Sequence, residues 1–176
     1  VVDDITQWAT RDYAGTYAQA VDDLDQLLRK VAAEIIPAEP AALSYSGGLD
    51  SSLIDIYCRN LTKYTLVTDR DPVSQMTEHT QHIVVDAEQW ADYFVRLSQR
   101  LMLPILSWSF VGYSIIASGV KERAILAGTG ADELFGGYPY VEQNISSPYS
   151  QGFNLAGDSF LLDYIVQSAG VDLLGT

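Results

Sequence analysis

The residues best suited to chemistry stand in one short segment, Ser46-Gly47-Gly48-Leu49-Asp50-Ser51-Ser52. Its two glycines allow backbone N–H groups to approach an anion closely, and its three serine hydroxyls can donate further hydrogen bonds. An apolar run at residues 41–45 comes before it, and a run with helical character follows at residues 53–60. We therefore predict a turn between a buried strand and a helix, with a polyphosphate bound at the positive end of the helix dipole.

Asp50 indicates that a cation takes part in this binding. A carboxylate repels a phosphate group unless a cation bridges the two, and Mg²⁺ is the best candidate. No lysine follows the glycines, so the segment is not a Walker A loop. The alternative interpretation is a turn without a ligand, whose serines and glycines only begin the helix.

A second segment, residues 128–138, has the sequence GTGADELFGGY and follows another apolar run at residues 123–127. Open α/β sheets bind ligands at the carboxyl ends of their strands, so we expect both segments at one edge of a sheet. Asp50 and Asp132 could then hold one Mg²⁺ on a triphosphate, which would repel either carboxylate alone. The alternative for Asp132 is the N-cap of a short helix through Phe135.

Together, the two segments resemble a known family. SGGLDSS resembles the SGGxDS loop of the PP-loop ATP pyrophosphatases, a superfamily whose members adenylate their substrates. Its pairing with GADELFGGY about eighty residues later resembles the asparagine synthetase group, which includes the β-lactam synthetases. The likeness covers roughly residues 16–140.

The resemblance implies roles for individual residues. Asp50 and Asp132 would hold Mg²⁺, and Thr129 would face the reacting acyl group, so these three are the candidate catalytic residues. Val67, with Ser44 or Tyr45, would lie beside the adenine; the alternative is that all three are core residues. The implied nucleotide-binding residues are Ser46, Gly47, Gly48, Asp50, Ser51, Ser52, Val67 and Gly128.

The reaction implied by the resemblance joins a carboxylate to a nitrogen nucleophile. A small-molecule or peptide carboxylate and Mg·ATP give an acyl-adenylate and pyrophosphate, and an amine or ammonia then forms the amide and releases AMP. One alternative is another chemistry of the superfamily such as thiolation, against which GADELFGGY counts. A second alternative is a non-catalytic nucleotide-binding subunit or assembly partner.

The chain departs from the family at Thr129, between the two glycines of the second segment. The family carries Glu at this position where ammonia attacks, and Tyr where an amine of the substrate itself attacks. A threonine can form hydrogen bonds but cannot act as a base near neutral pH. Ordinary asparagine synthesis is therefore in doubt.

Basic residues are missing from the carboxyl-terminal part of the chain. Arg123 is the last of them, whereas family members carry a downstream Lys that stabilises the departing pyrophosphate. Losing such a charge typically costs a few kcal/mol in the transition state. Three explanations are open: another chain supplies the cation, Lys121 or Arg123 reaches the site, or nucleotide is bound and turned over poorly. We expect a homo- or hetero-oligomer that supplies the missing basic residue.

Length and composition indicate one shortened domain, residues 1–176, without the glutaminase domain of the family. Residues 1–15 are a candidate flexible segment, and a chain that begins with Val rather than Met is a candidate fragment. The composition is 48% hydrophobic without a long apolar stretch, which excludes disorder and a membrane span. The net charge of −13 argues against nucleic-acid binding. Cys58, the single cysteine, suits a reducing cytoplasm and a buried position.

The order of elements predicts an α/β fold with a doubly wound parallel sheet, in the three-layer α/β/α arrangement of the PP-loop superfamily. An amphipathic helix with Thr16 as N-cap is expected to end near Pro37. Only thirteen residues separate Thr68 from His82, so that crossover must be a loop or a single turn. The expected strands are 41–45, 64–68, 82–85 and 123–127, and the other expected helices are 51–60, 87–102, 109–122 and one starting near Asp158.

Overall fold

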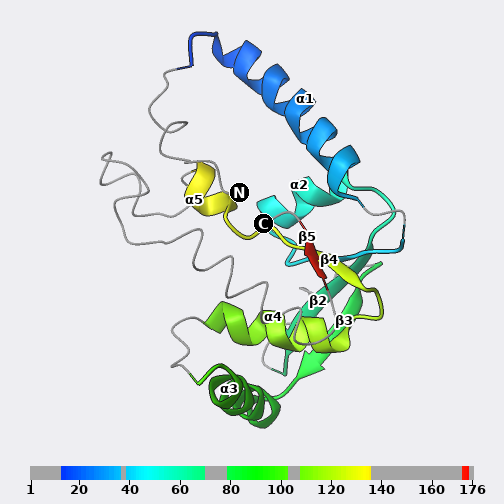
Figure 1. Ribbon diagram of the computed structural model, residues 1–176, viewed down its shortest axis with the longest axis vertical. Helices are drawn as coiled ribbons and strands as arrows, with labels where there is room; N and C mark the ends of the chain where they lie inside the picture. The colour runs from blue at the N-terminus through cyan, green and yellow to red at the C-terminus, as the bar shows by residue number, and fades with distance from the viewer. Residues whose placement is uncertain (1–12, 37–38, 70–78, 103–107, 136–171, 175–176) are drawn as a thin grey trace.

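The computed structural model describes residues 13–36, 39–69, 79–102, 108–135 and 172–174. Within those ranges five strands form one all-parallel sheet in the order β3-β2-β1-β4-β5. The strands are β1 Ala42–Ser44, β2 Thr62–Thr68, β3 Gln81–Val85, β4 Ala124–Leu126 and β5 Asp172–Leu174. The helices are α1 Tyr17–Ile35, α2 Leu49–Tyr57, α3 Ala87–Leu101, α4 Trp108–Gly119 and α5 Ala131–Phe135 (Figure 1). This arrangement confirms the predicted doubly wound α/β class.

The direction of strand addition reverses at β1. From β1 the sheet extends through β2 to β3 on one side, while β4 and β5 extend it on the other. β1 and β4 are direct neighbours, since Ala42 pairs with Ile125 and Leu43 with Leu126. A reversal of this kind opens a crevice outside the carboxyl ends of the two strands, where ligands bind in such sheets. Both segments of chemical interest start at this crevice.

Successive side chains of β1 and β4 pack into two different apolar layers. Leu43 and Leu126 belong to the layer that contacts α1 and α2. Ala42 and Ile125 belong to the layer on the opposite face, where Ile116 of α4 covers them. Because both faces of the central strands are covered, their sequences read as continuous apolar runs rather than as alternating ones.

The observed element boundaries lie close to those predicted from the sequence, with differences at a few ends. Thr16 is the predicted N-cap of α1 and forms a capping box with Gln19. Helix α2 begins at Leu49, two residues earlier than predicted, because Gly48 is its N-cap, and it ends at Tyr57 instead of at residue 60. Helix α4 ends at Gly119 and not at residue 122. Strand β5 was not predicted.

Several predictions fall on residues outside the described ranges. They concern residues 1–12 of the candidate flexible segment, residues 70–78 of the β2–β3 connection, the loop at 103–107 and the helix expected from Asp158. In the part of the chain that is described, no helix has the length and apolar character needed to cross a bilayer.

Candidate active site

The turn between β1 and α2 is held by hydrogen bonds among its own residues. Ser51 Oγ accepts from the Ser46 N–H at 3.3 Å, lies 3.1 Å from Ser46 Oγ and donates to the Gly48 carbonyl at 3.2 Å. Ser46 Oγ in turn accepts from the Gly48 N–H at 3.2 Å. Gly47 has a φ of 76°, a left-handed conformation that glycine adopts without strain. The loop therefore has a closed shape fixed by its own sequence.

This network engages the serine hydroxyls of the loop within the protein. Ser51 is only 4% exposed, and Ser52 Oγ lies 3.3 Å from the phenol oxygen of Tyr45, so all three hydroxyls already have protein partners. Gly48, the N-cap of α2, makes no side-chain hydrogen bond to the first turn. The first N–H groups of a helix have no acceptor inside the helix and carry the positive end of its dipole. The start of α2 is thus suited to a phosphate group.

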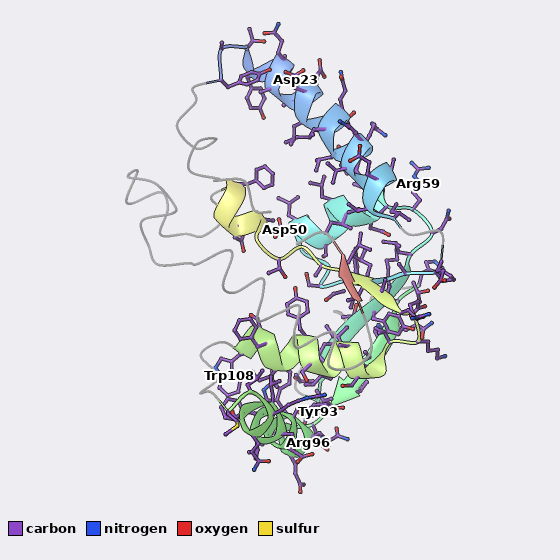
Figure 2. The ribbon with its side chains drawn as sticks, viewed as in Figure 1. Asp23, Asp50, Arg59, Tyr93, Arg96 and Trp108 are labelled. Atoms are coloured by element: carbon purple, nitrogen blue, oxygen red, sulfur yellow. The ribbon has the colours of Figure 1, made fainter. Side chains whose placement is uncertain are left out.

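The two segments touch at Gly128. A Cβ atom added to Gly128 would lie 2.9 Å from Asp50 Cβ and 3.5 Å from the Ser51 nitrogen. Carbon atoms pack no closer than about 3.5 Å, so only glycine allows the second segment to lie against the start of α2. Figure 2 shows Asp50 at this end of α2, beside the chain that runs from β4 toward α5. The fold therefore brings the two segments together at the crevice between β1 and β4.

The second segment turns sharply after β4 and then enters α5. Gly130 has a φ of 91°, and the Ala131 N–H donates to the Gly128 carbonyl at 3.4 Å. Asp132 is the second residue of α5, so the alternative in which it is the N-cap of this helix is wrong. Asp132 follows Gly128 by four residues in the sequence.

Thr129 lies between these two glycines and contacts a residue that the sequence analysis did not single out. Its Oγ1 is 2.6 Å from the phenol oxygen of Tyr113, which comes from the amino-terminal half of α4. Burial raises the pKa of Tyr113 above its ordinary value, and the hydrogen bond with Thr129 opposes this change. Both hydroxyls are therefore uncharged at neutral pH. The sequence around Tyr113 is that of an apolar helix and does not indicate a contact with Thr129, sixteen residues away.

One comparison with known proteins gives a match. The family model described as asparagine synthase matches residues 23–165, which is most of the chain. The chain belongs to the asparagine synthase family. Its domain is that of the PP-loop superfamily, and at the level of the family its chemistry is ATP-dependent carbon–nitrogen ligation. A search among curated proteins found no match.

Further hydrogen bonds fix the end of β1 in this asparagine synthase domain. The Tyr45 N–H donates to the Tyr64 carbonyl at 2.8 Å, and Thr65 Oγ1 donates to the Tyr45 carbonyl at 2.7 Å. Val67 in β2 is 4% exposed, so little of its surface remains for an adenine ring. Ser44 and Tyr45 are half-buried. The adenine assignment for these residues stays a prediction.

Lys121 and Arg123 lie at the amino-terminal end of β4, whereas the candidate site lies at its carboxyl end. Both come immediately before this strand, whereas Gly128 and Thr129 follow it. Parallel strands place their starts and ends at opposite edges of the sheet, and a side chain from one edge cannot pass through the packed core to the other. The structure thus argues against the explanation in which either residue reaches the nucleotide.

Both segments of the site contribute an acidic residue. No group of three His, Cys, Asp or Glu side chains forms a metal site among the described residues. Mg²⁺ commonly takes one or two carboxylates and completes its coordination with phosphate oxygens and water. Asp50 in α2 and Asp132 in α5 are carboxylates, one from each segment.

Proposed function

We propose that this domain binds Mg·ATP at the crevice between β1 and β4 and uses it to activate a carboxylate. The carboxylate oxygen attacks the α-phosphorus, so that an acyl-adenylate forms and pyrophosphate leaves. An amine or ammonia then attacks the acyl carbon to form an amide, with release of AMP and a proton. The observation that carries this proposal is the contact of Gly128 with Asp50, which joins the two segments into one site.

The first segment binds the phosphates through its backbone in this proposal. N–H groups at the start of α2 face the anion, and Gly47 and Gly48 let phosphate oxygens approach the main chain. Ser46 and Ser51 hold the loop in shape through their mutual hydrogen bonds. The sequence implied direct phosphate contacts for these serines, and the hydrogen bonds favour a supporting role for Ser51 in particular.

Asp50 and Asp132 are the residues that would hold Mg²⁺. When bound, the cation offsets the negative charge of the phosphates and so favours departure of pyrophosphate. Without the cation both carboxylates would repel the nucleotide, so the proposal requires Mg²⁺ to bridge them to the phosphates. The half-buried position of Asp50 against Gly128 limits the directions in which its carboxylate can turn.

Thr129 and Tyr113 line the part of the site where we place the acyl group. Their hydroxyls are 2.6 Å apart, and neither is ionised at neutral pH. They can therefore orient a carbonyl or an incoming amine through hydrogen bonds, but they cannot remove a proton from it. With Thr129 and Tyr113 in the site, the nucleophile must arrive as a neutral amine, or another group must remove its proton.

We further propose that a partner chain supplies the cation that stabilises pyrophosphate. Lys121 and Arg123 lie at the opposite edge of the sheet, and no basic residue follows Arg123 in the sequence. The partner would dock over the carboxyl ends of the strands. The same observation favours a second candidate function, a nucleotide-binding subunit without activity of its own. In either case we place the protein in the cytoplasm.

The test is ATP–pyrophosphate exchange by the purified chain with a panel of amino-acid and peptide carboxylates. Exchange that requires one carboxylate, whether from the chain alone or only after mixing with a second gene product, would support adenylation. Enzyme-like exchange by the monomer alone would refute the need for a partner. Tight binding of Mg·ATP without exchange under any condition would favour the non-catalytic function instead.

A further inference from the structure

Helix α1 carries an apolar stripe that is most exposed along the amino-terminal half of the helix. The stripe repeats every three or four residues and consists of Tyr17, Val21, Leu24, Leu28, Val31 and Ile35. Ile35 packs into the core beside α2, whereas Tyr17 is 87% exposed and Val21 is 48% exposed. Figure 1 shows the amino-terminal half of α1 reaching away from the sheet. A helix with apolar residues on its outward half usually has a partner.

The stripe continues into an apolar groove at the base of the helix. The groove has a volume of about 150 Å³ and lies between α1, α2 and the end of β4. Val31 and Ile35 form one wall, and Leu53 and Leu126 contribute to the other walls. An apolar partner that follows the stripe would therefore meet a prepared recess at its far end.

The stripe has the same spacing when it is read in either direction. About the level of Gln26, Tyr17 stands opposite Ile35, Val21 opposite Val31, and Leu24 opposite Leu28. Two copies of such a helix, placed antiparallel, bring every apolar position of one against an apolar position of the other. The interface of a symmetric dimer requires self-complementarity of this kind.

The charges of α1 favour the antiparallel orientation over the parallel one. Its first half carries three acids, Asp22, Asp23 and Asp25, and no base. Its second half carries Arg29 and Lys30 together with Glu34. A parallel pair would place three acids beside three acids, whereas an antiparallel pair places them beside the half that is net positive. Antiparallel packing also pairs opposite ends of the two helix dipoles.

We propose that α1 forms a symmetric antiparallel pair with α1 of a second copy of this chain. Tyr17 of each copy then lies at the level of the other copy's Ile35 and enters the groove beside Leu126. The pair buries the exposed halves of both stripes and centres near Gln26. This proposal rests on α1 and its groove alone and does not depend on the proposed function.

The first test is the molar mass of the full chain, measured by sedimentation equilibrium over a range of concentrations. The parent should be a dimer, and Val21→Glu should raise its dissociation constant by about tenfold or more, because a charge would be buried in the interface. Gln26→Glu is the matched control, since it adds the same charge on the exposed polar face of α1 and should leave the dimer intact. A parent that is monomeric throughout, or a Val21→Glu protein with unchanged mass, would overturn the proposal.

Disulfide cross-linking tests the orientation. In a Cys58→Ala background, Val21→Cys and Val31→Cys proteins are mixed and oxidised. An antiparallel pair predicts mixed disulfides between positions 21 and 31 and few disulfides between two copies of position 21. The reverse pattern would indicate a parallel pair and contradict the proposal, as would an absence of cross-linked chains. Far-UV circular dichroism shows whether each variant keeps the helix content of the parent.

Discussion

A single methyl group at Gly128 should separate the two segments of the site. The Gly128→Ala variant would place Cβ 2.9 Å from Asp50 Cβ, whereas ordinary carbon contacts begin near 3.5 Å. Asp50 Cβ is fixed to the backbone of α2 and cannot swing away. The second segment must therefore move from α2 by roughly half an ångström or more.

The size of the effect follows from the cost of overpacking, which is about 1–3 kcal/mol. If this strain is relieved by separation of the segments, affinity for Mg·ATP should fall by about 5- to 150-fold. Turnover should fall further, because a misplacement of about 1 Å at a reacting centre can reduce a rate about a hundredfold. Isothermal titration calorimetry measures the affinity, and urea unfolding measures the stability.

Gly112→Ala is the matched control for this substitution. Gly112 lies inside α4, and its added Cβ would meet Leu66 at 3.5 Å and Trp90 at 3.8 Å, which are ordinary contacts. Alanine in a helix interior is more favourable than glycine by about 0.5–1 kcal/mol, so this variant should be at least as stable as the parent and bind nucleotide normally. Parent-like Mg·ATP binding by Gly128→Ala would refute the reasoning that the two segments form one site.

Four further substitutions probe the loop and the acyl pocket. Ser51→Ala removes the three hydrogen bonds that close the phosphate loop and should lower stability by about 1–3 kcal/mol in urea unfolding, whereas Ser52→Ala, which loses one, should lower it by about 1 kcal/mol. Thr129→Glu should raise the ratio of ammonia to bulky amine used in amide formation, and an unchanged ratio would place Thr129 outside the reacting centre. Burial raises the pKa of Tyr113, so its contribution to stability is complete below about pH 10 and is lost as pH rises through the folded value. Because the pKa values of Tyr57 and Tyr64 are also raised, Tyr113→Phe should reduce the alkaline loss of stability without abolishing it, as followed by circular dichroism.

The family and the fold were predictable because their signals are local. The turn after β1 needs glycine for its backbone conformation. The alternation of apolar runs with segments of helical periodicity indicates a parallel sheet, even though it does not give the strand order. The predicted start of α2 at Ser51 was two residues late. It would make Asp50 the N-cap, and aspartate is a stronger N-cap than glycine, yet Gly48 holds that position. As a result Asp50 lies in the first turn of the helix and not in the loop before it.

Other features of the site depend on contacts that no local pattern reveals. Tyr113 and Thr129 are sixteen residues apart and come from different elements, so their hydrogen bond follows from how α4 packs on the sheet. The burial of Ser51 likewise depends on the shape of the closed loop, whereas the sequence shows only a serine near glycines. Strand β5 has three residues and is recognised by its pairing with β4, which periodicity cannot show.

The central claim is that Asp50 holds a cation on ATP at the joined ends of β1 and β4. The most direct measurement is calorimetric titration of ATP, with and without Mg²⁺, into the parent, Asp50→Asn and Asp55→Asn. Asp55 is a control on the same helix, where it pairs with Lys63 at 2.9 Å. Asp50→Asn should weaken Mg²⁺-dependent binding by tenfold or more, equivalent to about 1.4 kcal/mol, while Asp55→Asn should bind as the parent does. Undiminished Mg²⁺-dependent binding by Asp50→Asn would contradict the claim.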